Sequence, residues 1–216
     1  DNAEALRLPF AKLSSTFIKT KVVPETDAAR IAKIAGTEGI SVKAENLSDG
    51  ASVISALRAC SNKMDEDEVD AENRILFITP TLRGMISDLD TTKSKEVLSK
   101  FSTIIEVPQT RMYTKIELKD GKTAYGYAKA KDVYEATKDS SKQSGKTYYT
   151  KSGENYTKFT DESFTPGTTY YELVSEAGKE INFLCVERSA AVVHMEQFIK
   201  YFTPDEDQDG DDNVFK

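Results

Sequence analysis

Residues 73–86, NRILFITPTLRGMI, contain the pattern that decides the fold. A run of apolar residues from Ile75 to Ile78 ends just before Pro80, which is typical of a short buried strand. The segment that follows, LRGMISDLD (82–90), has the apolar spacing of a short helix. A buried strand that leads directly into a helix indicates a protein of mixed α and β structure.

A longer helix is predicted upstream of this strand, within NLSDGASVISALRACSNKMDEDEV (46–69). Ser48 or Asp49 can serve as its N-cap. The acidic run DEDE (65–68) would be repelled by the helix C-terminus and is therefore expected to point into water. The apolar stripe of this helix consists of Val53, Ile54, Leu57, Cys60 and Met64.

The remaining core elements are shorter or less regular. Near the N-terminus we expect a helix that is broken near Pro24, resumes, and is capped by Gly36. The segment SAAVVHMEQFIKYF (189–202) fits a helix or a strand, and a strand is favoured from His194 onward. A short helix is predicted for SKEVLSKF (94–101), and strands for TIIEVP (103–108), RMYTKIEL (111–118) and INFLCV (181–186).

Between Asp120 and Lys179 the composition changes to Lys, Ser, Thr, Gly and Tyr, and GKTYY at 145 returns as GTTYY at 167. Two Tyr/Thr-rich arms around a Ser-Gly-Glu-Asn turn (147–159) predict a β-hairpin. The polar residues 128–144 are interpreted as a linker or a solvated helix. The tyrosines either form a recognition surface or hold a small sheet together through cross-strand pairs, and the second interpretation is favoured.

Composition limits the function classes. Hydrophobic residues make up 38% of the chain, enough to fill an ordinary core, and the net charge of -7 opposes nonspecific binding of nucleic acid by the average surface. Cys60 and Cys185 have apolar neighbours, so we expect two reduced, buried thiols that react slowly. No apolar run is long enough to span a membrane. The sequence begins at Asp1 without a methionine, which suggests processing or an engineered boundary.

The sequence does not predict an enzyme. The single histidine, His194, disfavours general-base schemes and transition-metal sites, and the common nucleophile, phosphate-loop and zinc motifs do not occur. In the last twelve residues, Asp205, Asp207, Asp209 and Gly210 match calcium-loop positions, but Lys216 replaces the bidentate glutamate. This stretch is interpreted as a solvated acidic turn. No catalytic, cofactor-binding or metal-binding residue is assigned.

Six segments, taken in order, resemble the major capsid proteins of tailed bacteriophages and prophages, the group with the HK97 fold. The resemblance covers about 160 residues outside 121–178. The segments are KVVPETDAARIAKIAG (21–36), ASVISALRACSNKMDEDEV (51–69), NRILFITPTLRGMI (73–86), IIEVPQTRMYT (104–114), INFLCVERSAAVV (181–193) and FTPDEDQDGDDNVFK (202–216).

The resemblance implies an α+β, HK97-like fold with a central mixed sheet flanked by helices and an inserted β-hairpin subdomain. It also implies that the acidic stretch connects two strands, and that the family's N-terminal arm, extended loop and closing strand are largely missing, so the chain is expected to be the truncated core of a longer protein. The implied domains are 1–36 (peripheral-domain helix region), 37–120 (axial-type α/β domain), 121–178 (insertion), 179–201 (return to the core domain) and 202–216 (acidic turn toward the peripheral domain).

The implied function is that of a shell subunit, made in the bacterial cytoplasm and located in the virion capsid. Its expected partners are other copies of itself in capsomers and a scaffolding protein, with only nonspecific contact to packaged DNA and none to a membrane. The insertion would decorate the capsid exterior. The alternative is a surface binding module in which the Tyr-rich insertion recognises a host surface or a glycan.

Overall fold

A three-stranded mixed sheet lies at the centre of the computed structural model, which describes residues 12–89, 91–191, 201–202 and 214–215. The middle strand is β1 (Arg74–Ile78), which pairs in parallel with β2 (Thr103–Glu106) and antiparallel with β9 (Phe183–Glu187). The predicted α+β class is confirmed, and the predicted strands at 74–78, 103–106 and 183–186 occur in this sheet.

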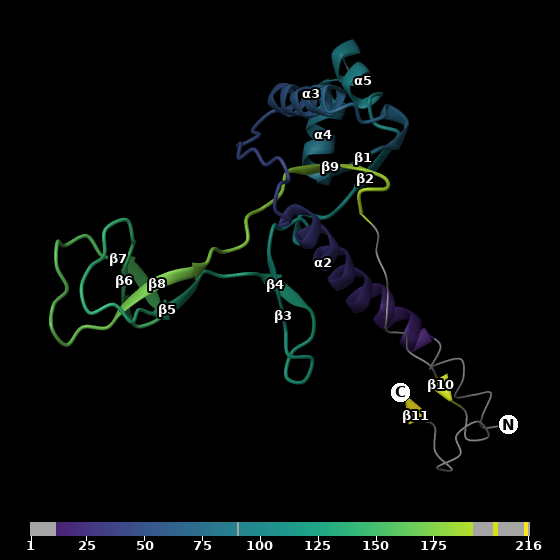
Figure 1. Ribbon diagram of the computed structural model, residues 1–216. Coiled ribbons are helices and arrows are strands. Elements are labelled where there is room, and N and C mark those ends of the chain that lie inside the picture. Colours follow the sequence, from purple (N-terminus) through teal and green to yellow (C-terminus); the bar gives the residue numbers. More distant parts are fainter. Residues whose placement is uncertain (1–11, 90, 192–200, 203–213, 216) are drawn as a thin grey trace.

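Helices α3 (Gly50–Glu66), α4 (Pro80–Leu89) and α5 (Thr92–Leu98) gather on one face of this sheet (Figure 1). Alternate residues of β1, Leu76 and Ile78, are fully buried against them, as a period of two requires. The cluster consists of Val53, Ile54, Leu57, Leu76, Ile78, Leu82, Ile86, Val97 and Phe101.

The opposite face of the sheet packs on α2 (Val23–Ala35). Phe77 of β1 and Leu184 of β9 contact a second buried cluster there. Ile31 of α2 belongs to this cluster together with Val107, Met112 and Ile181. Three helices therefore cover one face of the central sheet, and the C-terminal part of α2 packs against the other through the second apolar cluster.

The predicted break near Pro24 is wrong. Helical backbone continues from residue 12 to Ala35, and a π-helical segment, η1 (Ile18–Val22), lies directly before α2. Proline lacks an N–H and crowds the carbonyl four residues earlier, so the wider π turn accommodates it without ending the helix. At the other end Gly36 is the C-cap, as predicted, and donates its N–H to the carbonyl of Ala32 at 2.8 Å.

Helix α3 begins at a capping box. Asp49 is the N-cap and accepts a hydrogen bond from the backbone N–H of Ser52 at 2.8 Å, while the Ser52 hydroxyl accepts one from the Asp49 N–H at 3.3 Å. Of the two predicted N-caps, Ser48 and Asp49, the structure therefore has Asp49. The predicted apolar stripe is confirmed as the core-facing side of α3, although Cys60 and Met64 at its C-terminal end are only partly buried.

The acidic run 65–68 is exposed to solvent, as expected, but Asp65 also pairs with a buried cation. Its Oδ1 lies 2.7 Å from Nη1 of Arg74, whose side chain is only 3% exposed, and Lys100 lies 3.6 Å from Oδ2. The hydrogen bond from Arg74 lowers the pKa of Asp65. Arg74 also donates from Nε to the carbonyl of Val69 at 3.1 Å. Because the chain reverses after α3, the buried guanidinium of Arg74 at the start of β1 lies beside Asp65 at the C-terminal end of α3.

Two predictions for the middle of the chain also fail. Of the strand predicted over 111–118, only β3 (Ile116–Leu118) forms, after the 3-10 turn η3 (Gln109–Arg111). The polar segment 128–144 is neither a linker nor a helix, because it contributes to β4 (Tyr127–Lys129) and contains β5 (Val133–Ala136). Strand β4 pairs with β3, and β5 pairs with β8. These pairings stabilise strands in a segment whose polar composition does not predict them.

Residues 131–177, which we call the lobe, form a four-stranded antiparallel sheet of their own in the order β5-β8-β6-β7. The predicted hairpin is confirmed as β6 (Tyr149–Ser152) and β7 (Asn155–Lys158), and β8 (Tyr170–Ser175) joins β5 to it. Figure 1 shows the lobe to the left, apart from α3, α4 and α5. The lobe is larger than the inserted hairpin that the sequence predicts.

The lobe joins the body through two chain segments that lie next to each other. Gly178 donates its N–H to the carbonyl of Ala130 at 2.9 Å, and Ala130 donates to the carbonyl of Lys115 at 3.2 Å. A Cβ at Gly178 would lie 2.1 Å from the Lys115 oxygen, so only glycine fits there. The boundary expected at 120/121 falls instead in the connection between β3 and β4, which pair as a hairpin.

We expect the body to stay folded when residues 132–176 are replaced by a short Gly/Ser linker. Neither apolar cluster of the body contains a lobe residue, and the two ends of the excised segment are already adjacent. Calorimetry should still show a cooperative transition. Excision of 121–178, which also removes β4 from its hairpin, is the matched comparison and should lower the melting temperature more. Loss of the transition in the 132–176 variant would show that the lobe is integral to the body.

The last described elements are β10 (Tyr201–Phe202) and β11 (Val214–Phe215), which pair antiparallel. The acidic stretch thus has a strand on each side, as expected of a connection between strands. Residues 203–213, and 192–200 with His194, lie outside the described residues. Within the described ranges, no helix is both long enough and apolar enough to cross a membrane.

Candidate functional site: the tyrosine-rich lobe

The segment before β6 forms a turn that is closed by a tyrosine hydroxyl. Lys146 donates its backbone N–H to the carbonyl of Gln143 at 3.3 Å, and Gly145 has φ of 83°, the left-handed conformation that the third position of a type II turn requires. The backbone N–H of Gln143 donates to the hydroxyl of Tyr148 at 3.2 Å. The tyrosine therefore fixes the turn that leads into its own strand.

The segment before β8 repeats this geometry. Thr168 donates its N–H to the carbonyl of Thr165 at 3.2 Å, and Gly167 has φ of 82°. The N–H of Thr165 donates to the hydroxyl of Tyr170 at 2.8 Å. Pro166 occupies the second position, where type II turns favour proline. The sequence echo at 145 and 167 thus corresponds to two equivalent tyrosine-closed turns.

The strands that follow the two turns pair with each other, which brings the Tyr-Tyr dipeptides side by side. Tyr149 lies opposite Tyr171, and Thr150 lies opposite Tyr170. Successive side chains of a strand point to opposite faces, so Tyr148 and Tyr170 share one face of the lobe. Each dipeptide supplies one ring to each face.

Four tyrosines, one from each strand, cover the face that includes Tyr149 and Tyr171. Tyr134 of β5 stacks on Tyr156 of β7 with centroids 4.0 Å apart, and Tyr134 also contacts Tyr149 edge-on at 4.9 Å. Strands β5 and β7 are the two edges of the sheet, which would lie roughly 14 Å apart in a flat sheet. The stacked pair therefore indicates that the sheet curls around this face. Much of the surface of these rings is buried against other tyrosines.

The opposite face carries a second aromatic cluster that is more deeply buried. Tyr148 is fully buried and Tyr170 is 4% exposed. Phe164 stacks on Tyr170 with centroids 3.9 Å apart and meets Tyr148 edge-on at 4.9 Å, and Phe159 contacts Tyr170 at 4.7 Å. This cluster is the core of the lobe.

A charged network borders this cluster. Oδ2 of Asp139 accepts hydrogen bonds from the Tyr148 hydroxyl at 2.6 Å and from Nζ of Lys146 at 2.8 Å. Lys146 also lies 3.4 Å from Glu172, which accepts a hydrogen bond from Thr137. The hydrogen bond from Lys146, followed by that from Tyr148, lowers the pKa of Asp139. Asp139 is therefore ionised at neutral pH, and the adjacent ammonium compensates its charge.

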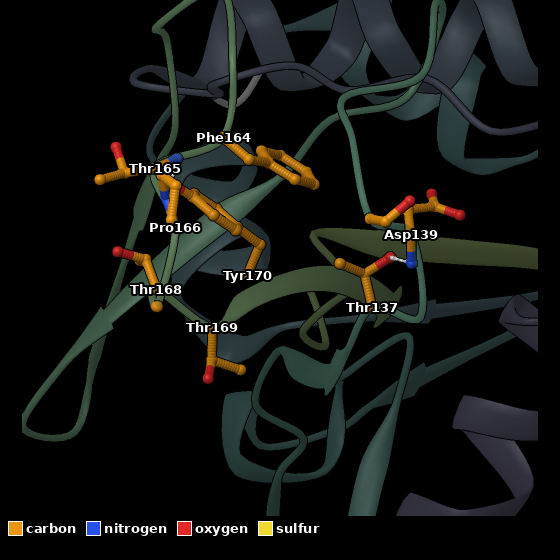
Figure 2. Close-up of a pocket in the computed structure, with 10 residues that line it drawn as sticks. Thr137, Asp139, Phe164, Thr165, Pro166, Thr168, Thr169 and Tyr170 are labelled. Carbon is orange, nitrogen blue, oxygen red and sulfur yellow. Dashed lines mark hydrogen bonds between the residues drawn. The ribbon is translucent and has the colours of Figure 1, made fainter.

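A pocket of about 470 Å³ lies beside this network (Figure 2). Thr137, Asp139 and Ser140 line one side, and the loop 164–170, which contains the second tyrosine-closed turn, lines the other. Figure 2 shows the ring of Phe164 pointing from this loop toward Asp139 and Thr137. Sites for small molecules occupy roughly 300–1,000 Å³, so this pocket is large enough for one.

The sequence alone predicts no residue of this pocket. Of its two interpretations of the tyrosines, cross-strand packing describes the four tyrosines of the other face, whose rings contact one another between strands. Tyr148 and Tyr170 instead pack on phenylalanines in the interior of the lobe. The available signal was the hydroxyl-rich turn TPGTT (165–169) next to an aromatic residue. The opposite wall, which contains Thr137, Asp139 and Ser140, lies more than twenty residues earlier in the chain. Residue spacing alone therefore could not predict that the two segments form one pocket.

The residues singled out for metal chemistry do not form a site in the described part of the chain. His194 and the acidic residues 205–212 lie outside it, so the absence of a calcium site there stays a prediction. Among residues 12–89 and 91–191, no group of three or more His, Cys, Asp or Glu side chains is close enough to hold a metal ion.

Cys60 of α3 and Cys185 of β9 are free thiols, and both are partly exposed rather than fully buried as predicted. The two thiols interact. A hydrogen bond from Cys185 lowers the pKa of Cys60, and the positive charge of Arg74 adds to this effect. The same pairing with Cys60, together with burial, raises the pKa of Cys185.

We expect Cys60 to react faster with maleimide than Cys185, because the thiolate is the reactive species and only the Cys60 thiolate is stabilised. This revises the expectation of two slow thiols. Time-resolved labelling followed by peptide mass spectrometry measures both rates in the folded protein. Cys185→Ala removes the donor and should slow Cys60, whereas faster labelling of Cys185 would contradict the assignment.

The lobe thus combines a hydroxyl-lined pocket, an aromatic ring and an ionised carboxylate with a charge partner. The body combines a helix-covered mixed sheet with a long N-terminal helix. Comparison of the chain with protein-family models, curated proteins and solved structures finds no match.

Proposed function

We propose that this chain is a structural subunit of a phage or prophage capsid shell with the HK97 fold, and that it works by self-association around DNA without a catalytic step. The resemblance stated above is the first support. Its segments include the elements of the layered body, since 51–69 contains most of α3, 73–86 contains β1 and the first part of α4, and 181–193 contains β9. The lobe lies outside the resemblance.

The observation that carries the proposal is a group of exposed apolar side chains on the N-terminal helix. Leu13 is 65% exposed, and Phe17, Ile18 and Val23 are each about 40% exposed. Figure 1 shows α2 extending away from α3, α4 and α5, so this end of the helix does not pack on them. Exposed apolar side chains gathered on one element mark an interaction surface. In a shell, a neighbouring copy would cover these side chains.

Charge is consistent with such a role. A net charge of -7 disfavours strong contact with DNA, so the packaged genome would be enclosed rather than specifically bound. The same charge resists association in dilute solution, which makes apolar contacts and a scaffolding partner the natural sources of assembly.

The test is assembly of this chain within its full reading frame, with and without a scaffolding partner. Electron microscopy and light scattering should show closed shells or rings, whereas residues 1–216 alone should stay a monomer or small oligomer. Leu13→Glu combined with Phe17→Glu should abolish assembly. Val174→Lys, at an exposed position of the lobe, is the control and should assemble normally. A full-length protein that never assembles would exclude the shell.

A second function, a binding module, is favoured by one observation, the pocket between residues 137–140 and 164–170. Removal of the lobe separates the two functions. A shell subunit should keep its folded body and its ability to assemble, whereas a binding module should lose its ligand.

A further inference from the structure

The pocket of the lobe has hydrogen-bonding capacity that the fold does not use. Within the described part of the chain, the hydroxyls of Ser140, Thr168 and Thr169 make no hydrogen bond to another protein group. Asp139 accepts two side-chain hydrogen bonds on Oδ2, and the Thr137 hydroxyl also acts on this carboxylate. A carboxylate has about four acceptor sites on its two oxygens, so it can accept a further hydrogen bond. The unused groups lie on both walls, so a ligand between them could exchange several hydrogen bonds at once.

The same pocket has an apolar side. Phe164 is held in place by stacking on Tyr170, and its ring points into the space between the walls (Figure 2). Pro166 is a second apolar group in the lining. An aromatic ring carries negative charge on its face, so it attracts C–H groups that neighbouring oxygen atoms have made slightly positive. A flat ligand with polar edges and a C–H face would match both parts of the lining.

The charge of the lobe argues for a neutral ligand. The lobe contains six lysines and eight acidic residues, so it carries a small net charge of -2, and most of the net charge of -7 resides outside it. Lys146, which lies beside the pocket and does not line it, compensates the charge of Asp139 at 2.8 Å. An anion would meet the carboxylate, and a cation would have to compete with the lysine, which disfavours both.

We propose that this pocket binds a neutral saccharide, with the sugar ring against Phe164 and its hydroxyls bonded to Asp139, Ser140, Thr168 and Thr169. A sugar hydroxyl both donates and accepts, so it can donate to the carboxylate of Asp139 and accept from the threonine hydroxyls. The pocket volume of about 470 Å³ accommodates one or two sugar rings. This inference names the ligand class of the lobe and is independent of shell assembly.

The experiment uses residues 1–216 on a glycan microarray that carries neutral, sialylated and sulfated oligosaccharides. Calorimetry then measures the affinity for the soluble form of the strongest neutral glycan, and for choline as a cationic probe. The variant Ser140→Ala/Thr168→Val/Thr169→Val removes three unused hydroxyls without removing a hydrogen bond of the fold. Loss of several hydrogen bonds should weaken binding at least tenfold.

Thr147→Val is the matched control. Thr147 precedes Tyr148 exactly as Thr169 precedes Tyr170 in the repeated turn, but Thr147 does not line the pocket. Its affinity should stay within twofold of the parent. Saccharide recognition is excluded if no neutral glycan binds at millimolar concentration, if only acidic glycans or choline bind, or if the triple variant binds as tightly as Thr147→Val. The triple variant should assemble normally in the shell assay, so a failure here and a failure of the shell proposal can be told apart.

Discussion

Replacement of Tyr148 by alanine should unfold the lobe and leave the body folded. The ring of Tyr148 is fully buried against Phe164, and its hydroxyl bonds to Asp139 and to the backbone of Gln143. The substitution therefore opens a large cavity and removes the closure of one turn. A unit of this size rarely has more than about 3–5 kcal/mol of stability to lose.

Hydrogen exchange with mass spectrometry distinguishes the two parts. Peptides from β6 and β8 should lose their protection, while peptides from β1 keep theirs. Tyr148→Phe keeps the ring and should cause a smaller loss. Tyr125→Ala, at a position that is 61% exposed and outside the lobe, is the control. It should change the exchange protection of neither the lobe nor the body. Retained protection in β8, or loss in β1, would contradict separate cores.

Leu57→Ala should lower the free energy of unfolding of the body by about 3 kcal/mol, the usual cost of such a cavity. Leu57 is fully buried in α3, in the cluster that joins this helix to β1 and α4. The clusters of the body contain no lobe residue, so exchange protection in the lobe should be unchanged. Urea unfolding followed by circular dichroism measures the loss.

The matched substitution is Leu118→Ala in β3, where the leucine is 56% exposed. It removes the same atoms without opening a buried cavity and should cost less than about 0.5 kcal/mol. Equal costs for the two variants would mean that the cluster around Leu57 is not the core of the body.

The elements that sequence patterns predicted correctly are those whose signal is local. The run from Ile75 to Ile78 before Pro80 specifies a strand and then a helix, and the alternation of Leu76 with Phe77 leaves both faces apolar. The stripe of α3 and the caps at Asp49 and Gly36 are likewise written into neighbouring residues. The turn between β6 and β7 belongs to the same group.

The features that patterns missed depend on distant partners. Asp65 is exposed, as predicted, but its ion pair forms only because the chain returns with Arg74 beside it. The strand β5 has a polar sequence and exists because β8 pairs with it. The walls of the pocket, at Asp139 and at 164–170, approach each other only after this pairing. None of these contacts has a periodic signature, so one sequence could not predict them.

The adjacency of the two segments that connect the lobe has a mechanical consequence. The bond from Gly178 to Ala130, at 2.9 Å, and the bond from the Ala177 N–H to the Asp132 carboxylate, at 2.7 Å, clamp the entry and the exit of the lobe together. A force that stretches the chain would be carried by these two hydrogen bonds and would not reach the strands of the lobe. Strands β5 to β8 would carry a load only after the clamp had sheared, so the lobe is sheltered from forces that stretch the body.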